Sequence, residues 1–101
     1  MEVKVETQVD RQRLLVSGDV DLSTSSQLRD ALNQLTREKV LRVEVNLAGV
    51  EYMDSSGIAT LVECLQQTNG YGGKLILTGM TDAVRSVFEL ANLLPVFTVE
   101  K

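Results

Sequence analysis

Residues 41–65 have the sequence LRVEVNLAGVEYMDSSGIATLVECL, in which a period of two gives way to a period near 3.6. Apolar and polar residues alternate from Leu41 to Leu47, which predicts a strand with one buried and one solvent-facing side. From Ile58 onward the apolar residues follow helical spacing, which predicts a helix. A strand buried on both faces would be apolar throughout, so we expect helices mainly on one side of the sheet.

The same two periods extend toward the N-terminus. Residues 3–9 alternate and residues 14–16 are apolar, which predicts two strands joined by a turn. Apolar residues at helical spacing then predict a helix over residues 24–38. Thr24 and Gln27 have the spacing of a capping box at the start of this helix.

The C-terminal part continues the alternation of strand and helix. Glycines within Asn69–Gly73 end the central helix, and residues 74–78 predict a short strand. Thr81 or Asp82 caps a third helix, and residues 96–99 form a last extended stretch. The order ββαβαβαβ predicts an α/β fold in which right-handed crossovers join parallel strands.

Composition limits the classes of function. The chain has 101 residues, which suits one domain over residues 1–101, and 44% of them are apolar. A net charge of −4, with lysines and arginines scattered singly, argues against a nucleic-acid partner. No apolar run approaches the roughly 18 residues of a membrane span, and the N-terminus has no signal-peptide core. We therefore expect a cytoplasmic protein without membrane insertion.

The absence of histidine is more restrictive still. Ser-His-Asp and Cys-His mechanisms are excluded, and a metal would need a cage of carboxylates, which are not spaced as in a calcium loop. We expect no catalytic residue, no metal and no cofactor. Cys64 is the single cysteine, and we expect it to be packed or half exposed, not reactive.

Met53-Asp54-Ser55-Ser56-Gly57 lies at the predicted start of the central helix. Unpaired backbone N–H groups and the positive end of the helix dipole favour an anion there, which suits phosphate on Ser55. Aspartate and serine are also preferred N-cap residues that need no further function. Gly57 is explained either by the close approach of another backbone or by packing alone.

Four segments follow one another in order along nearly the whole chain: Gly18-Asp19-Val20-Asp21, Met53 to Gly57, Gly72-Gly73-Lys74 and Ala83 to Phe88. Together they resemble the STAS family (sulfate transporter and anti-sigma factor antagonist), and most of all its free-standing bacterial members. The resemblance implies the STAS fold, a four- to five-stranded mixed sheet with helices packed mainly on one face.

The resemblance also implies a function, that of an anti-sigma factor antagonist with Ser55 as its phosphoacceptor. A serine kinase, often the anti-sigma factor itself, would phosphorylate Ser55, and a PP2C-type phosphatase would restore it. The unphosphorylated chain, a monomer that forms heterodimers, would bind the kinase and free its client, usually a sigma factor. The partner-binding residues would be Asp19, Asp21, Asp54, Ser55, Ser56 and Gly57. Turn formation by the first two aspartates and capping by Asp54 and Ser56 are the structural alternatives.

Two other functions are compatible with parts of the sequence. Some stand-alone STAS proteins are subunits of lipid-transport ATP-binding-cassette complexes that contact the ATPase, and these tend to have threonine or another residue where this chain has Ser55. An enzyme or nucleotide binder has less support, since the sequence has no P-loop and no Gly-x-Gly-x-x-Gly motif.

Phosphate on an already acidic face is expected to repel a partner more than to refold the domain.

Overall fold

A five-stranded mixed sheet forms the centre of the computed structural model, which describes residues 1–100. The elements, in chain order, are β1 (Glu2–Thr7), β2 (Gln12–Ser17), α1 (Ser25–Arg37), β3 (Arg42–Gly49), α2 (Ser55–Gly70), β4 (Lys74–Thr78), α3 (Asp82–Leu90), a 3-10 turn (Leu94–Val96) and β5 (Thr98–Glu100). This order confirms the ββαβαβαβ prediction. The short 3-10 turn after Leu93 is an addition that the sequence pattern did not predict.

The strands lie side by side in the order in which they occur in the chain. β1 and β2 are antiparallel and form a hairpin, whereas β2, β3, β4 and β5 run parallel to one another. In the hairpin turn the Gln8 N–H donates to the Arg11 carbonyl over 2.9 Å. β1 ends at Thr7, and Val9, which was predicted to be part of the first strand, lies fully exposed in the turn.

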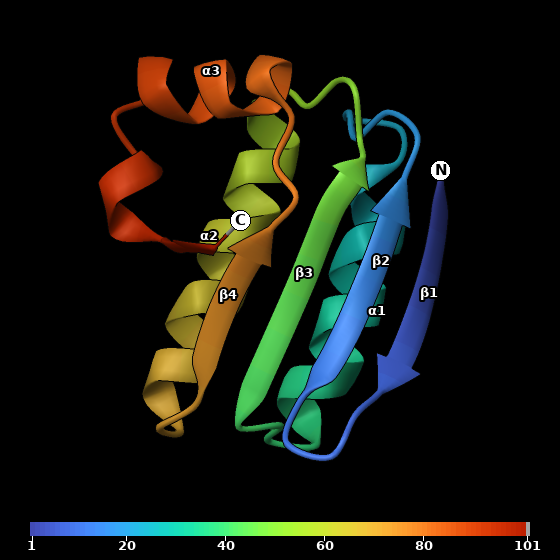
Figure 1. Ribbon diagram of the computed structural model, residues 1–101, viewed down its shortest axis with the longest axis vertical. Coiled ribbons are helices and arrows are strands. Elements are labelled where there is room, and N and C mark those ends of the chain that lie inside the picture. Colours follow the sequence, from blue (N-terminus) through green and yellow to red (C-terminus); the bar gives the residue numbers. More distant parts are fainter. Residues whose placement is uncertain (101) are drawn as a thin grey trace.

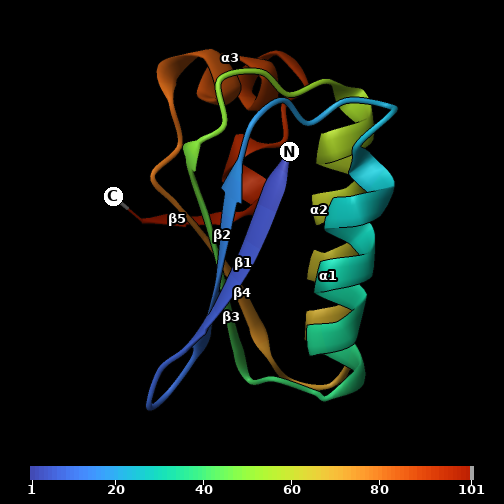
Figure 2. The same ribbon diagram turned by 90° about the vertical axis from the view of Figure 1, so that its right-hand side faces the viewer.

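Helices α1 and α2 lie side by side on one face of the sheet, and α3 lies across the end at which β3 and β4 finish (Figures 1 and 2). The opposite face is covered by no helix of residues 1–100 (Figure 2). This confirms the one-sided arrangement that the alternation in residues 41–47 predicts. None of the helices within residues 1–100 has the length and apolar character needed to cross a membrane.

The core fills the space between the sheet and the helices. Val43, Val45 and Leu47 of β3 are fully buried, as the period of two predicts. Phe88 of α3 packs edge-on against Phe97, with ring centroids 5.3 Å apart, and so links the C-terminal helix to the chain that leads into β5. Cys64 is buried within this core.

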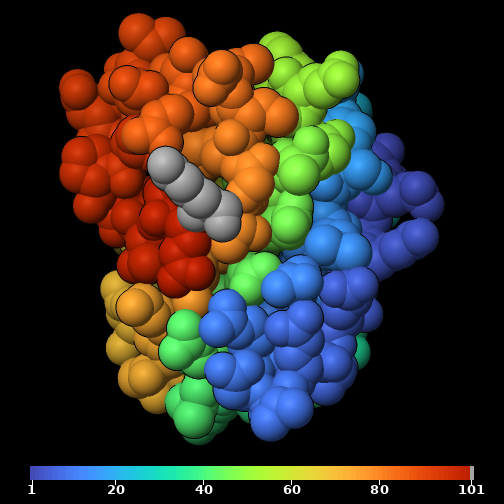
Figure 3. Space-filling model, viewed as in Figure 1, coloured from blue at the N-terminus to red at the C-terminus, as the bar shows by residue number. Residues whose placement is uncertain are grey.

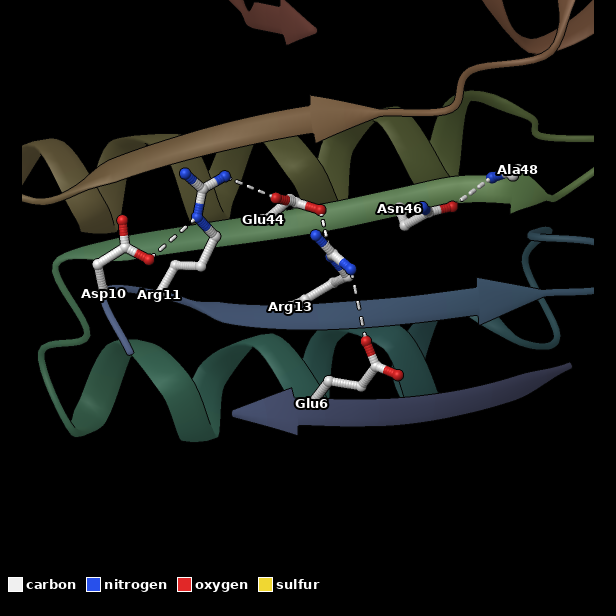
Figure 4. A network of polar contacts seen from close by, with 7 residues as sticks. All are labelled: Glu6, Asp10, Arg11, Arg13, Glu44, Asn46 and Ala48. Atoms are coloured by element: carbon white, nitrogen blue, oxygen red, sulfur yellow. Dashed lines mark hydrogen bonds and ion pairs between the residues drawn. The ribbon is translucent and has the colours of Figure 1, made fainter. Parts of the chain in front are cut away.

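On β3, the side that was predicted to face the solvent contains one buried residue. Glu44, on β3, has only 3% of its surface exposed. Its carboxylate accepts a 2.8 Å hydrogen bond from Arg11 Nη1 and a short hydrogen bond from Arg13 Nε (Figure 4). Burial acts to raise the pKa of Glu44, but the hydrogen bonds from both arginines outweigh it and lower the pKa below the usual value. The long arginine side chains thus replace the solvent over Glu44.

Candidate functional site

Two loops meet at the end of the sheet where α2 begins. The first loop, residues 18–24, follows β2, and the second loop, residues 50–54, follows β3. Val20, in the first loop, and Met53, in the second, form an isolated parallel bridge. The Val20 N–H donates to the Tyr52 carbonyl over 2.9 Å, and the Asp54 N–H donates to the Val20 carbonyl over 3.1 Å. These bonds hold Asp19 and Asp21, the neighbours of Val20, beside the segment that carries Ser55.

Asp54 is the N-cap of α2, as one of the two sequence-based interpretations holds. Its side-chain Oδ1 accepts the Ser56 N–H at 2.9 Å and also the Ser56 hydroxyl. Its backbone carbonyl accepts from the N–H groups of Gly57 and Ile58. The hydrogen bond from the Ser56 hydroxyl is the main cause that lowers the pKa of Asp54, so the carboxylate is charged at neutral pH.

Ser55 is the first residue of α2 and is exposed. Among residues 1–100, its hydroxyl takes part in no hydrogen bond. The oxygen is thus accessible and contributes no hydrogen bond to the fold of residues 1–100. In contrast to the expectation of free helix N–H groups, those of Ser56, Gly57 and Ile58 are already bonded to Asp54. A phosphate on Ser55 would therefore compete with Asp54 for these donors instead of finding them vacant.

Ser56 and Gly57 each have a structural role in the fold, which the sequence alone did not decide. The Ser56 hydroxyl donates to Asp54, and the Ser56 carbonyl accepts a 2.8 Å hydrogen bond from the Thr60 hydroxyl. A Cβ at Gly57 would lie 2.6 Å from the Met53 Cγ and 2.8 Å from the Val20 Cγ1. Packing against these two side chains is therefore sufficient to explain the glycine.

The first loop is organised by Asp21. Its Oδ1 accepts hydrogen bonds from the N–H and the hydroxyl of Ser23, at 2.9 and 2.7 Å, and the Ser23 hydroxyl is the main cause of the lowered pKa of Asp21. The Thr24 hydroxyl accepts from the Asp21 N–H and donates to the Asp19 carbonyl. Thr24 consequently makes no side-chain cap to α1, and the predicted capping box with Gln27 is wrong.

The two loops carry charge of one sign. Residues 19–22 and 51–55 contain four carboxylates, those of Asp19, Asp21, Glu51 and Asp54, and neither segment contains a lysine or arginine. The side chain of Asp19 is exposed and makes none of the hydrogen bonds found within residues 1–100. No group of three or more acidic or cysteine side chains within residues 1–100 is arranged to hold a metal ion.

A shallow apolar groove begins at Ser55 and follows α2 toward the segment after α3. Its volume is about 500 Å³. The lining residues are Ser55, Ile58, Ala59, Val62, Glu63, Gln66, Ala91 and Leu93. The groove was not predicted from the sequence, although Ala59 and Val62 beside Ile58 indicate an apolar stripe wider than one buried face.

The chain is similar to known proteins over nearly its full length. A family model described as "Mlab, STAS domain" matches residues 3–95. The chain is 28% identical to an anti-sigma-B factor antagonist of Staphylococcus aureus and 29% identical to that of Staphylococcus epidermidis, in each case over 93 residues that cover 92% of this chain and 86% of the relative.

Solved structures share the fold. The anti-sigma factor antagonist SpoIIAA in its unphosphorylated form superposes with a TM-score of 0.83 at 20% identity, covering 99% of this chain and 89% of that one. An anti-sigma factor antagonist from Mycobacterium paratuberculosis gives a TM-score of 0.88 at 21% identity, covering 97% of this chain and 83% of the other.

Proposed function

The chain belongs to the STAS-domain family, and on that premise we propose that it acts as an anti-sigma factor antagonist that is switched by phosphorylation of Ser55. The unphosphorylated form binds an anti-sigma factor that is also a serine kinase, and so frees the client of that kinase. Phosphate on Ser55 abolishes the binding, and a PP2C-type phosphatase restores it. The protein works in the cytoplasm as a monomer that forms heterodimers, and it is not an enzyme.

One observation carries the proposal: the Ser55 hydroxyl is exposed and unbonded among residues 1–100, at the start of α2 and at the mouth of an apolar groove. A kinase can reach such a hydroxyl without unfolding the helix. A partner that covers the groove must also cover Ser55. Modification of this one oxygen therefore changes the surface that the partner contacts.

Charge explains why phosphate would release the partner. A phosphate brings about −1.5 to −2 charges at neutral pH. It would join the four carboxylates of residues 19–22 and 51–55. The N–H groups of Ser56, Gly57 and Ile58 are already hydrogen-bonded to Asp54, so the phosphate would gain little by binding to the start of the helix. It would remain at the surface, where it would repel the partner or prevent a close fit with it.

The other predicted partner-binding residues divide into two groups. Asp19, with its exposed and unbonded carboxylate, is suited to contact a cationic group of the kinase directly. Asp21, Asp54, Ser56 and Gly57 hold the shape of the two loops through hydrogen bonds and packing, and act on the partner mainly through Ser55 and Asp19.

The experiment uses the serine kinase of the pathway, ATP and the purified chain. Mass spectrometry should find phosphate on Ser55, none on Ser55→Ala and full incorporation on Ser56→Ala. Calorimetry should then show binding of the anti-sigma factor by the unphosphorylated chain and none after phosphorylation. Phosphate on another residue, or equal binding by both forms, would overturn the proposal.

A second candidate is a permanent subunit of a lipid-transport ATP-binding-cassette complex. Exposed apolar side chains in the C-terminal part of the chain favour it, because Leu90 is 86% exposed and Val96 is 53% exposed. Purification of the chain with an ATPase and a permease, in a complex that Ser55→Glu leaves intact, would support this candidate. Loss of every partner in Ser55→Glu would favour the switch.

A further inference from the structure

The edge of the sheet formed by β1 has no neighbour within residues 1–100, and its charges are arranged to match themselves. The side chains of Glu2, Lys4 and Glu6 lie on the open face. The N-terminal part of the chain, dark blue, lies at one border of the surface seen in Figure 3. Those of Val3, Val5 and Thr7 lie on the helix side. We propose that β1 pairs antiparallel with β1 of a second copy of this chain, so that Lys4 of each copy lies opposite Glu6 of the other.

The backbone of β1 is set up for this pairing. The Gln8–Arg11 hydrogen bond fixes these two residues as a bonded pair of the hairpin, and bonded pairs alternate along an antiparallel ladder. With the register Thr7↔Gln12 to Glu2↔Ser17, the even-numbered residues of β1 direct their N–H and C=O groups toward β2. The same groups of Val3, Val5 and Thr7 therefore point outward from the edge, where a second strand can bond to them.

Charge and strand overlap together select the register. Placing Val3 opposite Val3 also pairs Lys4 with Glu2, but it overlaps only residues 2–4 of the two strands, whereas placing Val5 opposite Val5 overlaps residues 3–7. When Val5 of one copy lies opposite Val5 of the other, Lys4 of each copy lies opposite Glu6 of the other. These two pairs occupy non-hydrogen-bonded positions, where side chains are closest. Moving the register by two residues in one direction places Lys4 opposite Lys4 and Glu2 opposite Glu6. Moving it by two in the other direction places Glu6 opposite Glu6. Both shifts bring like charges together, which destabilises a strand pair.

The ion pairs of the open face lead to this edge. Arg11 and Arg13 bind Glu44, and Arg13 also lies 3.6 Å from Glu6 (Figure 4). The chain of alternating charges therefore crosses β3 and β2 and ends on β1 at Glu6. Lys4 takes part in none of the ion pairs of residues 1–100. In the proposed register, Lys4 of the second copy adds the next cation to the series.

The helix side of the edge also has room for a second strand. A groove of about 420 Å³ lies between β1 and α1, lined in part by Val3, Val5, Ala31 and Leu35. Val5 is 52% exposed there. The valines of the second copy would cover this apolar surface. With one strand from each copy, the interface is small and belongs to the weak, concentration-dependent class.

Charge reversal with mixing tests the register. Sedimentation at low salt, up to about 1 mM protein, should show a monomer–dimer equilibrium that salt weakens. Lys4→Glu alone and Glu6→Lys alone should each weaken the dimer by roughly tenfold or more. An equal mixture of these two variants should associate again, because the acidic edge then meets the basic one. Circular dichroism checks that both variants are folded.

A cross-link tests the geometry independently of charge. Val5→Cys should form a disulfide-linked dimer, because hydrogen-bonded partners have Cα atoms about 5.5 Å apart. Thr7→Cys is the matched control, since its two copies would be about 13 Å apart in this register and should not link. A chain that remains monomeric at about 1 mM, a mixture that fails to associate or linkage through Thr7→Cys would overturn the proposal.

Discussion

Gly57 lies against the side chain of Met53, so closely that a Cβ on Gly57 would be 2.6 Å from the Met53 Cγ. Val20 Cγ1 would be 2.8 Å away on the same side. We expect Gly57→Ala to lower the free energy of unfolding by about 1–2 kcal/mol, since overpacking outweighs the roughly 0.5–1 kcal/mol by which alanine favours a helix. Urea denaturation measures the change.

Gly70, at the other end of α2, is the matched control. Nothing lies within 4 Å of a Cβ at this position. Gly70→Ala should therefore show only the helix preference and raise the free energy of unfolding by up to about 1 kcal/mol. If the two alanine variants changed stability in the same direction, the contact with Met53 would not be the reason for Gly57.

The buried carboxylate of Glu44 should make stability depend on pH. Glu44→Gln removes the charge that Arg11 and Arg13 surround, and we expect a loss of about 1–3 kcal/mol at pH 7. Because the folded-state pKa of Glu44 is lowered from 4.5, its contribution is present above that value and is lost as the pH falls through the folded-state pKa. The difference between wild type and variant should shrink when urea denaturation is repeated at about pH 3.

Glu89 serves as the control for this measurement. It forms an exposed i,i+4 ion pair with Arg85 on α3, at 3.6 Å. Such surface pairs contribute little, so Glu89→Gln should change the free energy of unfolding by less than about 0.5 kcal/mol at either pH. An equally large loss from Glu89→Gln would show that loss of a negative charge, and not the buried position of Glu44, causes the effect.

The fold was largely predictable because its signals are local. The alternation at Val43, Val45 and Leu47 determines which side of β3 is buried, and the glycines after residue 69 end α2 where the structure ends it. Burial of Glu44 was not predictable from its own strand. It depends on Arg11 and Arg13, which are 33 and 31 residues away in the sequence and reach it only once β2 and β3 are paired.

The candidate site was predictable to a similar extent. Capping by Asp54 follows from residue type and position alone. The Val20–Met53 bridge and the groove do not, because each joins segments that are distant in the sequence. The Gly18 to Asp21 motif drew attention to its two aspartates. The residue that joins the loops is the valine between them, whose role appears only in the backbone hydrogen bonds.

Cys64 should be unreactive while the protein is folded. Its thiol is buried, and desolvation, with a smaller contribution from Glu63, raises its pKa to about 12. Almost no thiolate is present at neutral pH, and the thiolate is the reactive form. A thiol reagent such as dithionitrobenzoate should modify Cys64 in urea but not in buffer. Rapid reaction of the folded protein would show that the thiol is accessible.

An acidic substitution should affect stability much less at Ser55 than at Ser56. Ser55 is exposed and unbonded within residues 1–100, so Ser55→Glu should change the free energy of unfolding by less than about 0.5 kcal/mol. Ser56→Glu removes the hydroxyl that donates to Asp54 and places a second carboxylate beside it, which should cost about 0.5–1.5 kcal/mol.

Backbone amide NMR spectra of the same variants separate repulsion of a partner from refolding of the domain. Ser55→Glu should shift only signals from the start of α2 and the loop of residues 19–22, because Asp54 retains the helix N–H groups. If shifts extended into β3 and β4, the added charge would be reorganising the sheet, and a switch based on surface charge alone would be wrong. Unchanged sheet signals, together with loss of anti-sigma factor binding, would place the whole effect at the surface around Ser55.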